Sequence, residues 1–175
     1  QWDQGGIIKL RVPDCLALES AAVTLYRPGG ETLDLQSLEV GYAAAVTSQA
    51  ESGDYTVLTL DTGDEGEGEP EGPGAPPTSL RGRRIRCIMA VGPVVEPIVE
   101  AVGDDSVTVR LPRRCGTVTA ILDPTLEATV PVLEETDVAD GYKAVFAFTA
   151  DDAPKSDTVR FAVAHRVYGG LTMAD

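Results

Sequence analysis

Residues 10–15 read LRVPDC, and residues 109–115, about 100 positions later, read VRLPRRC. Each stretch is followed by a run in which Val and Thr are neighbours, AVTL at residues 22–25 and TVTA at residues 117–120. β-Branched residues favour strands, and a proline followed by small or polar residues is typical of a turn. We therefore expect the same strand–turn–strand unit at both places.

Two further landmarks follow in the same order in both halves of the chain. A Gly-Tyr pair stands at residues 41–42 and again at 141–142, and an acid precedes a Thr-Val run at Asp54 and at Asp157. Four landmarks at a nearly constant offset indicate an internal duplication. Short β-rich runs bounded by turn residues predict strands rather than helices. The expected fold class is therefore all-β, with two small antiparallel β-sandwich lobes.

A segment without large apolar residues separates the two copies. Residues 61–77 read DTGDEGEGEPEGPGAPP, with six acids and no base. Such a segment buries too little apolar surface to offset its ordering entropy, so we expect a flexible acidic Gly/Pro linker. The expected organisation is a first lobe with an N-terminal arm at residues 1–62, a linker at 63–80 and a second lobe at 81–175.

The overall composition limits the classes of partner. Hydrophobic residues make up 43% of the chain, enough for packed cores, and the formal net charge is −14. An acidic chain opposes general binding to nucleic acid or to an anionic membrane, since both depend on cationic surface. No apolar run approaches the roughly 20 residues needed to cross a bilayer. The chain starts at Gln1 rather than Met, so we expect a processed or truncated start, which leaves secretion open.

Three cysteines permit at most one intramolecular disulfide. Cys15 and Cys115 occupy equivalent positions of the two copies, which are expected to lie far apart. Cys87 lies in an apolar run and fits a small buried residue. We therefore expect three free thiols and folding in a reducing cytoplasm.

One short motif resembles a family of β-sandwiches. Residues 51–57 read ESGDYTV, and this acidic-Gly-x-Tyr approach to a late strand resembles that of immunoglobulin-like and fibronectin-like domains. In that family the tyrosine, here Tyr55, packs at a corner and hydrogen-bonds back to the chain. The second copy has no tyrosine between Asp157 and Thr158, and Trp2 stands at the terminus rather than in a core beside a cysteine pair. The resemblance implies a sandwich architecture and no activity.

A second resemblance rests on turn chemistry and composition. Tandem minimal sandwiches with a YRPGG hairpin, here at residues 26–30, look like accessory proteins of tailed-phage particles. These include capsid decoration proteins and tail or neck attachments. The resemblance implies a protein that docks passively on a larger assembly.

Residue types with catalytic or metal-binding chemistry are sparse in the sequence. His165 is the only histidine, and no Gly-x-Ser-x-Gly frame accompanies it, so we expect a half-buried strand-end residue rather than a catalytic relay. The cysteines lack the ligand spacing of a zinc site. The acids of the linker offer oxygen ligands to calcium, but their spacing does not match an EF-hand, and a solvated linker is favoured. We expect no enzymatic activity, no cofactor and no metal.

A basic cluster opens the second lobe, with four arginines in six residues and no interleaved aromatic side chain. In an acidic chain this pattern is a poor nucleic-acid footprint. Because the planar arginine fork suits carboxylates, we expect the cluster to pair with the acidic linker of the same chain or of a neighbour. The cluster consists of Arg81, Arg83, Arg84 and Arg86.

The expected function is that of a non-enzymatic structural protein, most concretely a phage capsid decoration or virion accessory protein. Its expected partners are a protein lattice or neighbouring subunits, with a major capsid protein as one candidate, and neither nucleic acid nor membrane. We expect an oligomeric or lattice-bound state in a virion assembled in the host cytoplasm. The contact residues are expected in the N-terminal arm, the arginine cluster and the linker: Trp2, Ile7, Ile8, Arg81, Arg83, Arg84, Arg86, Glu67, Glu69 and Glu71. Trp2, a lone tryptophan in a polar arm, is the best single anchor.

Two other classes stay open. One is a secreted or cell-surface module, such as an adhesin fragment or filament subunit, whose N-terminal arm is a donated strand. A closed disulfide favours this extracellular class, and free thiols favour the virion protein. The other is a carbohydrate- or calcium-binding accessory domain, which calorimetric titration would detect.

Overall fold

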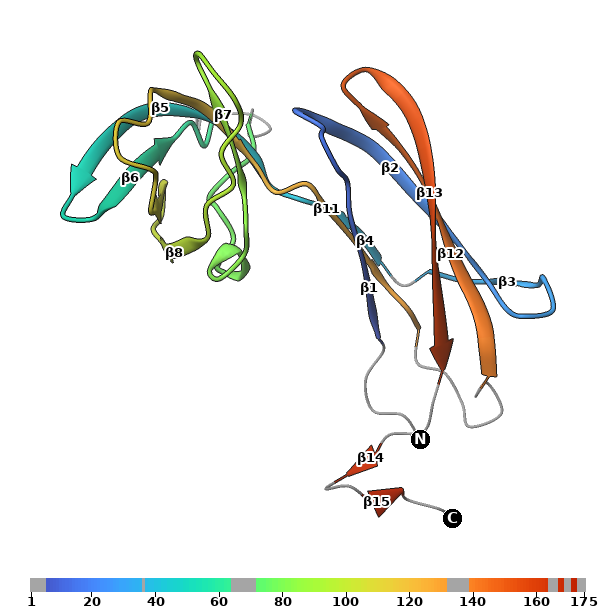
Figure 1. The fold of residues 1–175 in the computed structure, drawn as a ribbon. Coiled ribbons are helices and arrows are strands. Elements are labelled where there is room, and N and C mark those ends of the chain that lie inside the picture. Colours follow the sequence, from blue (N-terminus) through green and yellow to red (C-terminus); the bar gives the residue numbers. More distant parts are fainter. Residues whose placement is uncertain are drawn as a thin grey trace. The chain divides into compact units, whose positions relative to one another are not determined.

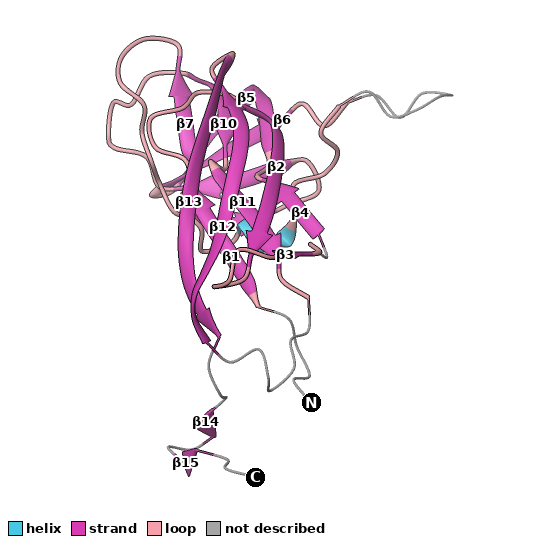
Figure 2. Ribbon diagram, turned by 90° about the vertical axis from the view of Figure 1, so that its right-hand side faces the viewer, coloured by secondary structure: helices cyan, strands magenta, loops and turns pink. Residues whose placement is uncertain are grey.

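The computed structural model describes residues 6–35, 37–63, 72–131 and 139–163, together with the backbone at 167–168 and 171–172. Strands dominate these residues, and the only helical element among them is the 3-10 helix η1 (Thr78–Leu80) (Figure 1, Figure 2). The expected all-β class with antiparallel sheets is confirmed. The chain divides into two compact units, and each is described by itself.

Unit 1 comprises Gln1–Val12, Leu18–Val40 and Thr125–Asp175. It contains a three-stranded sheet of order β1-β11-β4, a four-stranded sheet of order β13-β12-β2-β3 and a two-stranded sheet, β14-β15 (Figure 1). All pairings are antiparallel. The strands are β1 (Ile7–Arg11), β2 (Leu18–Tyr26), β3 (Thr32–Leu33), β4 (Ser37–Val40), β11 (Thr125–Thr129), β12 (Ala139–Ala150), β13 (Ala153–Val163), β14 (Val167–Tyr168) and β15 (Leu171–Thr172).

Side-chain alternation along the strands decides which face of unit 1 is buried. In β12, Tyr142, Ala144 and Phe146 are buried in turn, and the residues between them are more exposed. β1 buries Ile8 and Leu10 in the same alternating way. A period of two is what a sheet with one covered face requires. These side chains form the core of unit 1.

The turn between β12 and β13 explains how the longest hairpin closes. Asp151 and Asp152 have φ values of 50° and 62°, and Ala150 lies opposite Ala153. Two successive left-handed residues give a type I′ turn, whose twist matches that of the flanking strands. Aspartate tolerates this region better than most residues, so the sequence suits the turn.

Unit 2 comprises Pro13–Ala17 and Gly41–Pro124 and contains one six-stranded antiparallel sheet of order β7-β10-β5-β6-β9-β8. The sheet curls into a half-barrel. Backbone hydrogen bonds join the segments along its two edges, from Cys87 N–H to the Val95 carbonyl (2.7 Å) and from Val99 N–H to the Arg83 carbonyl (2.9 Å). The strands are β5 (Ala43–Ser52), β6 (Tyr55–Leu60), β7 (Arg86–Met89), β8 (Val99–Val102), β9 (Ser106–Val109) and β10 (Val118–Leu122).

The core of unit 2 consists mainly of aliphatic side chains from these strands and from η1. Leu58, Ile85 and Val107 are fully buried in it, and Leu80 of η1 contributes a further buried side chain. Aliphatic side chains of this size fill the narrow space inside a curled sheet.

Several sequence predictions agree with the strands. The Val-Thr run at residues 22–25 lies within β2, and the run at 117–120 overlaps β10. A hairpin turn at Asp104 and Asp105 connects β8 to β9. β4, which pairs with β11, has a weak alternation and was missed.

The expected order of lobes along the chain differs from the units in the structure. β5 and β6 were placed in a lobe at 1–62, and β9 and β10 in a lobe at 81–175, yet β5 pairs with β10 and β6 pairs with β9. The segment 63–80 lies between strands of a single compact unit, and Leu80 is part of that unit's core. The reason is that strand pairing is non-local, so a break in composition need not separate two units.

Among the described residues, none lies in a helix with the length and apolar character needed to cross a membrane.

We expect Leu58→Ala to lower the free energy of unfolding by about 2–5 kcal/mol, because it removes a fully buried side chain and leaves a cavity. Leu16→Ala, at a side chain that is half exposed, is the matched control and should cost less than about 1 kcal/mol. Chemical denaturation measures both values. Equal losses in the two variants would contradict the assigned core.

Candidate functional site

The expected arginine cluster does not form one outward-facing patch. Arg86 is buried, with only 6% of its surface exposed. Its Nη1 donates to the Cys15 carbonyl at 2.6 Å, and its Nε donates to a carboxylate oxygen of Glu96 at 3.2 Å. Arg86 therefore holds residues 13–17 and the segment around Glu96 to β7, a structural role.

Arg83 also points inward. Its Nη1 lies 3.0 Å from Oδ2 of Asp123, which is 2% exposed, and Oδ1 of that aspartate has no hydrogen-bond partner among the described residues. Arg84 is exposed and donates to the Glu96 backbone carbonyl at 3.0 Å. Arg81 is exposed as well. Of the four expected contact residues, two thus serve the interior of unit 2.

The N-terminal arm divides between core and surface. Ile7 is 58% exposed on β1, whereas Ile8 is buried, because adjacent strand residues face opposite sides. Trp2, His165 and the three expected linker contacts lie outside the described residues. The linker contacts are Glu67, Glu69 and Glu71.

Unit 2 carries an apolar loop between β7 and β8. Val91 is 88% exposed, and Val94 and Ile98 in the same loop are exposed too. The loop is anchored by the bridge between Cys87 and Val95. Aliphatic side chains left in water on an anchored loop mark a surface suited to contact with another protein.

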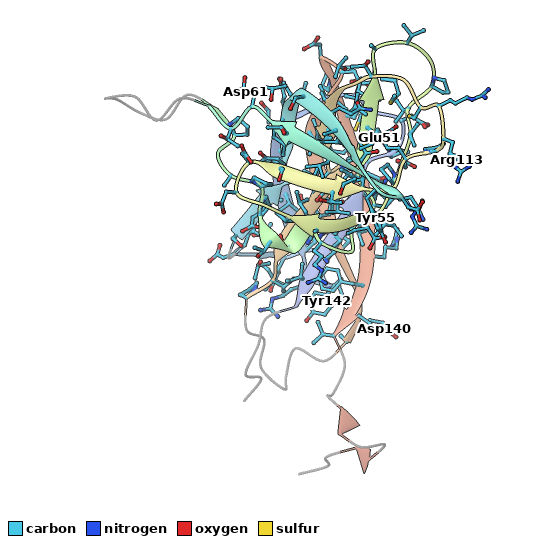
Figure 3. All side chains as sticks on the ribbon, turned by 90° about the vertical axis from the view of Figure 1, so that its left-hand side faces the viewer. Glu51, Tyr55, Asp61, Arg113, Asp140 and Tyr142 are labelled. Carbon is cyan, nitrogen blue, oxygen red and sulfur yellow. The ribbon has the colours of Figure 1, made fainter. Side chains whose placement is uncertain are left out.

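A groove of about 450 Å³ lies where the β5–β6 turn meets the β9–β10 connection. Figure 3 shows Glu51, Tyr55 and Arg113 at this end of the β5–β6 hairpin and Asp61 at the other. Three arginines and two carboxylates supply the charges of its lining. These charged residues are Arg110, Arg113, Arg114, Glu51 and Asp54.

Contacts within the groove position its parts. The guanidinium of Arg110 lies over the ring of Tyr55 at 5.0 Å, and its Nη2 donates to the tyrosine hydroxyl at 3.2 Å. Gln49 accepts from Val118 N–H at 3.0 Å and donates to the Gly116 carbonyl, which fixes the rim. This Tyr55 contact differs from the corner bond to the backbone that the immunoglobulin-like resemblance implied.

The three cysteines are free thiols. Cys15 and Cys87 are buried, and the half-buried Cys115 lines the groove. Burial, with a smaller contribution from Cys115, raises the pKa of the Cys87 thiol to about 12. Cys115 Sγ lies 3.9 Å from Sδ of Met89, so it has one apolar and one solvent-facing side.

Within the part of the chain that the structure describes, no three His, Cys, Asp or Glu side chains gather as a metal site would require. The chemistry that the groove offers is charge-assisted hydrogen bonding to an anion, since arginine donates through a planar fork.

Comparison with known proteins gives no family for this chain. No family model matches it, and no curated protein or solved structure shows significant similarity to it.

The three groove arginines lie within five residues, but the sequence pattern identifies that stretch only as a repeated turn. Arg110, Arg113 and Arg114 belong to the second landmark stretch, where the first copy has Arg11 and Asp14. The extra positive charge at the turn was the available signal. The stretch with these arginines becomes one side of a groove only because the β5–β6 turn, which is far away in the sequence, lies next to it.

We expect Arg83→Ala to lower the free energy of unfolding by about 2–3 kcal/mol, because it leaves the buried carboxylate of Asp123 without its partner. Arg81→Ala, at an exposed arginine nearby, should change stability by less than about 0.5 kcal/mol. Adding Asp123→Asn to Arg83→Ala should recover part of the loss, since the uncompensated charge is gone. Urea denaturation of the variants tests this, and equal stability of the two single variants would refute it.

We expect Cys115 alone to react with iodoacetamide in the native protein near pH 8. The thiolate is the reactive form, and both burial and a pKa of about 12 keep Cys87 protected there. Mass spectrometry of peptides should show one adduct in the native protein and three after denaturation. Native labelling of Cys87 as fast as Cys115 would show that the strand carrying it opens readily.

Proposed function

We propose that this protein is a non-enzymatic structural protein that docks on a larger assembly, most concretely a phage capsid decoration or virion accessory protein. The observation that carries the proposal is the exposed apolar loop between β7 and β8. Its partners are a protein lattice or neighbouring subunits, such as a major capsid protein, and its location is the virion.

Exposed aliphatic side chains favour docking over a free existence in water. Each one that becomes covered gains roughly 25 cal/mol per Å² of apolar surface removed from water. Val91, Val94 and Ile98 lie within eight residues, and the bridge at Val95 already orders the loop. A pre-ordered loop loses little conformational entropy on binding, which increases affinity.

The free thiols support a virion protein over a secreted module. A small secreted sandwich is often stabilised by a disulfide, and the three cysteines here form none.

We also propose that the chain consists of two immunoglobulin-like β-sandwich lobes derived from an internal duplication. Asp14 and Arg114, each directly before a cysteine, both adopt left-handed φ values, 56° and 62°. Such values are uncommon outside glycine, so their recurrence at equivalent positions supports a shared turn.

Strand pairing supports an exchange of hairpins between the copies. The hairpin β12–β13 of the second copy lies beside β2 of the first, and the hairpin β5–β6 of the first lies beside β10 of the second. Ala144 of the second copy lies opposite Leu25 of the first. Ala44, which corresponds to Ala144, lies opposite Ile121, and this is one residue after Ala120, the residue that corresponds to Leu25. Each unit would then combine early strands of one copy with the late hairpin of the other.

The docking proposal is tested on particles from the source culture. An antibody raised against the recombinant protein should detect the chain in density-purified virions. Detection only in the soluble medium or in the cell envelope would contradict it.

We expect Val91→Asp to weaken rebinding to stripped particles by about tenfold or more, because a charge replaces an apolar contact at the loop. Ser48→Asp introduces the same charge at an exposed position of β5 and should rebind like the wild type. Cosedimentation measures both variants, and thermal melting confirms that they fold. Equal rebinding of the two would remove the loop from the interface.

A further inference from the structure

We propose that the arginine groove of unit 2 binds a carboxylate-rich extended peptide, and that its occupant is the acidic segment 61–71 of a second copy of this chain. The groove is formed by the β5–β6 turn and the β9–β10 connection, as defined above. The inference goes beyond docking on a virion and does not depend on it.

The first observation is that the charges of the groove arginines are not neutralised by ion pairs with the described residues. Among the described residues, Arg110, Arg113 and Arg114 take part in no ion pair, although Glu51 and Asp54 line the same groove. Their charges are therefore available to a partner from outside.

The second observation is that the groove is prepared before binding. Tyr55 positions the guanidinium of Arg110 through its ring and its hydroxyl, and Gln49 holds the end of the β9–β10 connection through Val118 N–H. Arg114 holds a left-handed φ of 62°, stabilised by a turn in which Cys115 N–H donates to the Pro112 carbonyl at 3.0 Å. A strained non-glycine residue in a concave site is typical of a functional position.

The lining also indicates the class of anion. Two carboxylates among three arginines would repel a ligand with dense charge, such as a polyphosphate or a nucleic acid. Carboxylates spaced along a peptide fit better, because neutral residues can face Glu51 and Asp54. Arginine binds carboxylates through two parallel N–H donors.

The sequence of the chain contains a segment with that spacing. Between residues 65 and 71, glutamates alternate with Gly66, Gly68 and Pro70. In an extended peptide, alternate side chains lie on the same side, about 7 Å apart. The four glutamates would then present one row of carboxylates.

The base of the segment and the groove lie apart in the same chain. Its two ends meet, since Gly74 N–H donates to the Thr62 carbonyl at 3.0 Å and a Cβ on Gly72 would lie 2.6 Å from the Gly63 Cα. The groove lies beyond the six residues of β6, on the order of 20 Å away, at the opposite end of the hairpin from Asp61 (Figure 3). This separation favours the segment of a second copy as the occupant.

The test uses a fluorescent peptide with the sequence of residues 60–73, titrated against the full chain by anisotropy. We expect saturable binding that weakens as ionic strength rises to about 0.15 M and above. Arg113→Glu combined with Arg114→Glu should weaken it by about tenfold or more. The control, Arg81→Glu with Arg160→Glu, makes the same charge change at exposed arginines outside the groove and should bind like the wild type.

Further arms separate the possible ligands. A peptide with glutamine and asparagine in place of the acids should not bind, and the acidic peptide should protect Cys115 from iodoacetamide. In sedimentation velocity, the full chain should lose self-association in Arg113→Glu with Arg114→Glu and in Glu67→Gln with Glu69→Gln and Glu71→Gln.

Three outcomes would overturn the proposal. They are peptide binding that is equal in the groove and control variants, no saturable binding up to about 1 mM, and displacement of the peptide by pyrophosphate at lower concentration than by unlabelled peptide. The last outcome would assign the groove to phosphates. None of these results bears on the detection of the chain in virions, so the two proposals fail separately.

Discussion

The backbone hydrogen bonds between β5 and β10 are the interaction on which the architecture depends. They place Ala43, Ala44 and Ala45 opposite residues 122, 121 and 120, far along the chain. A strand with an unpaired edge exposes donors and acceptors that must find partners, so this pairing also fixes the positions of β6 and β9. Both the curled sheet of unit 2 and the arginine groove at its end follow from it.

The distribution of arginines connects stability with function in this acidic chain. Arg86 and Arg83 are held inside unit 2 against Glu96 and Asp123, where losing one partner would leave a buried polar group unsatisfied. Arg113 and Arg114 stay at the surface without such partners. Buried arginines thus form ion pairs that stabilise the unit, whereas exposed arginines are available for binding.

Much of the local structure could be predicted from sequence, and little of the pairing. Alternation of apolar and polar residues locates β6, and Gly103 with two aspartates locates the turn before β9. Alternation tells which face of a strand is buried but not which strand lies beside it. The acidic segment was therefore placed between two lobes, although the strands before and after it belong to one sheet. The four-arginine cluster does not form one outward-facing patch for a related reason, because Arg83 and Arg86 pair with Asp123 and Glu96, which the sequence spacing does not reveal.

The sequence by itself determined that the chain is all-β, where some of its strands and turns lie, and that its charge is strongly negative. These are local properties, set by side-chain shape, backbone preference and composition. The tertiary structure alone decided which strands pair, which arginines are buried and that Arg110, Arg113 and Arg114 meet the β5–β6 turn in a groove. Those outcomes depend on contacts between residues far apart in the sequence, such as Arg110 and Tyr55 at a separation of 55 positions, whose partners are selected by the packing of the whole unit.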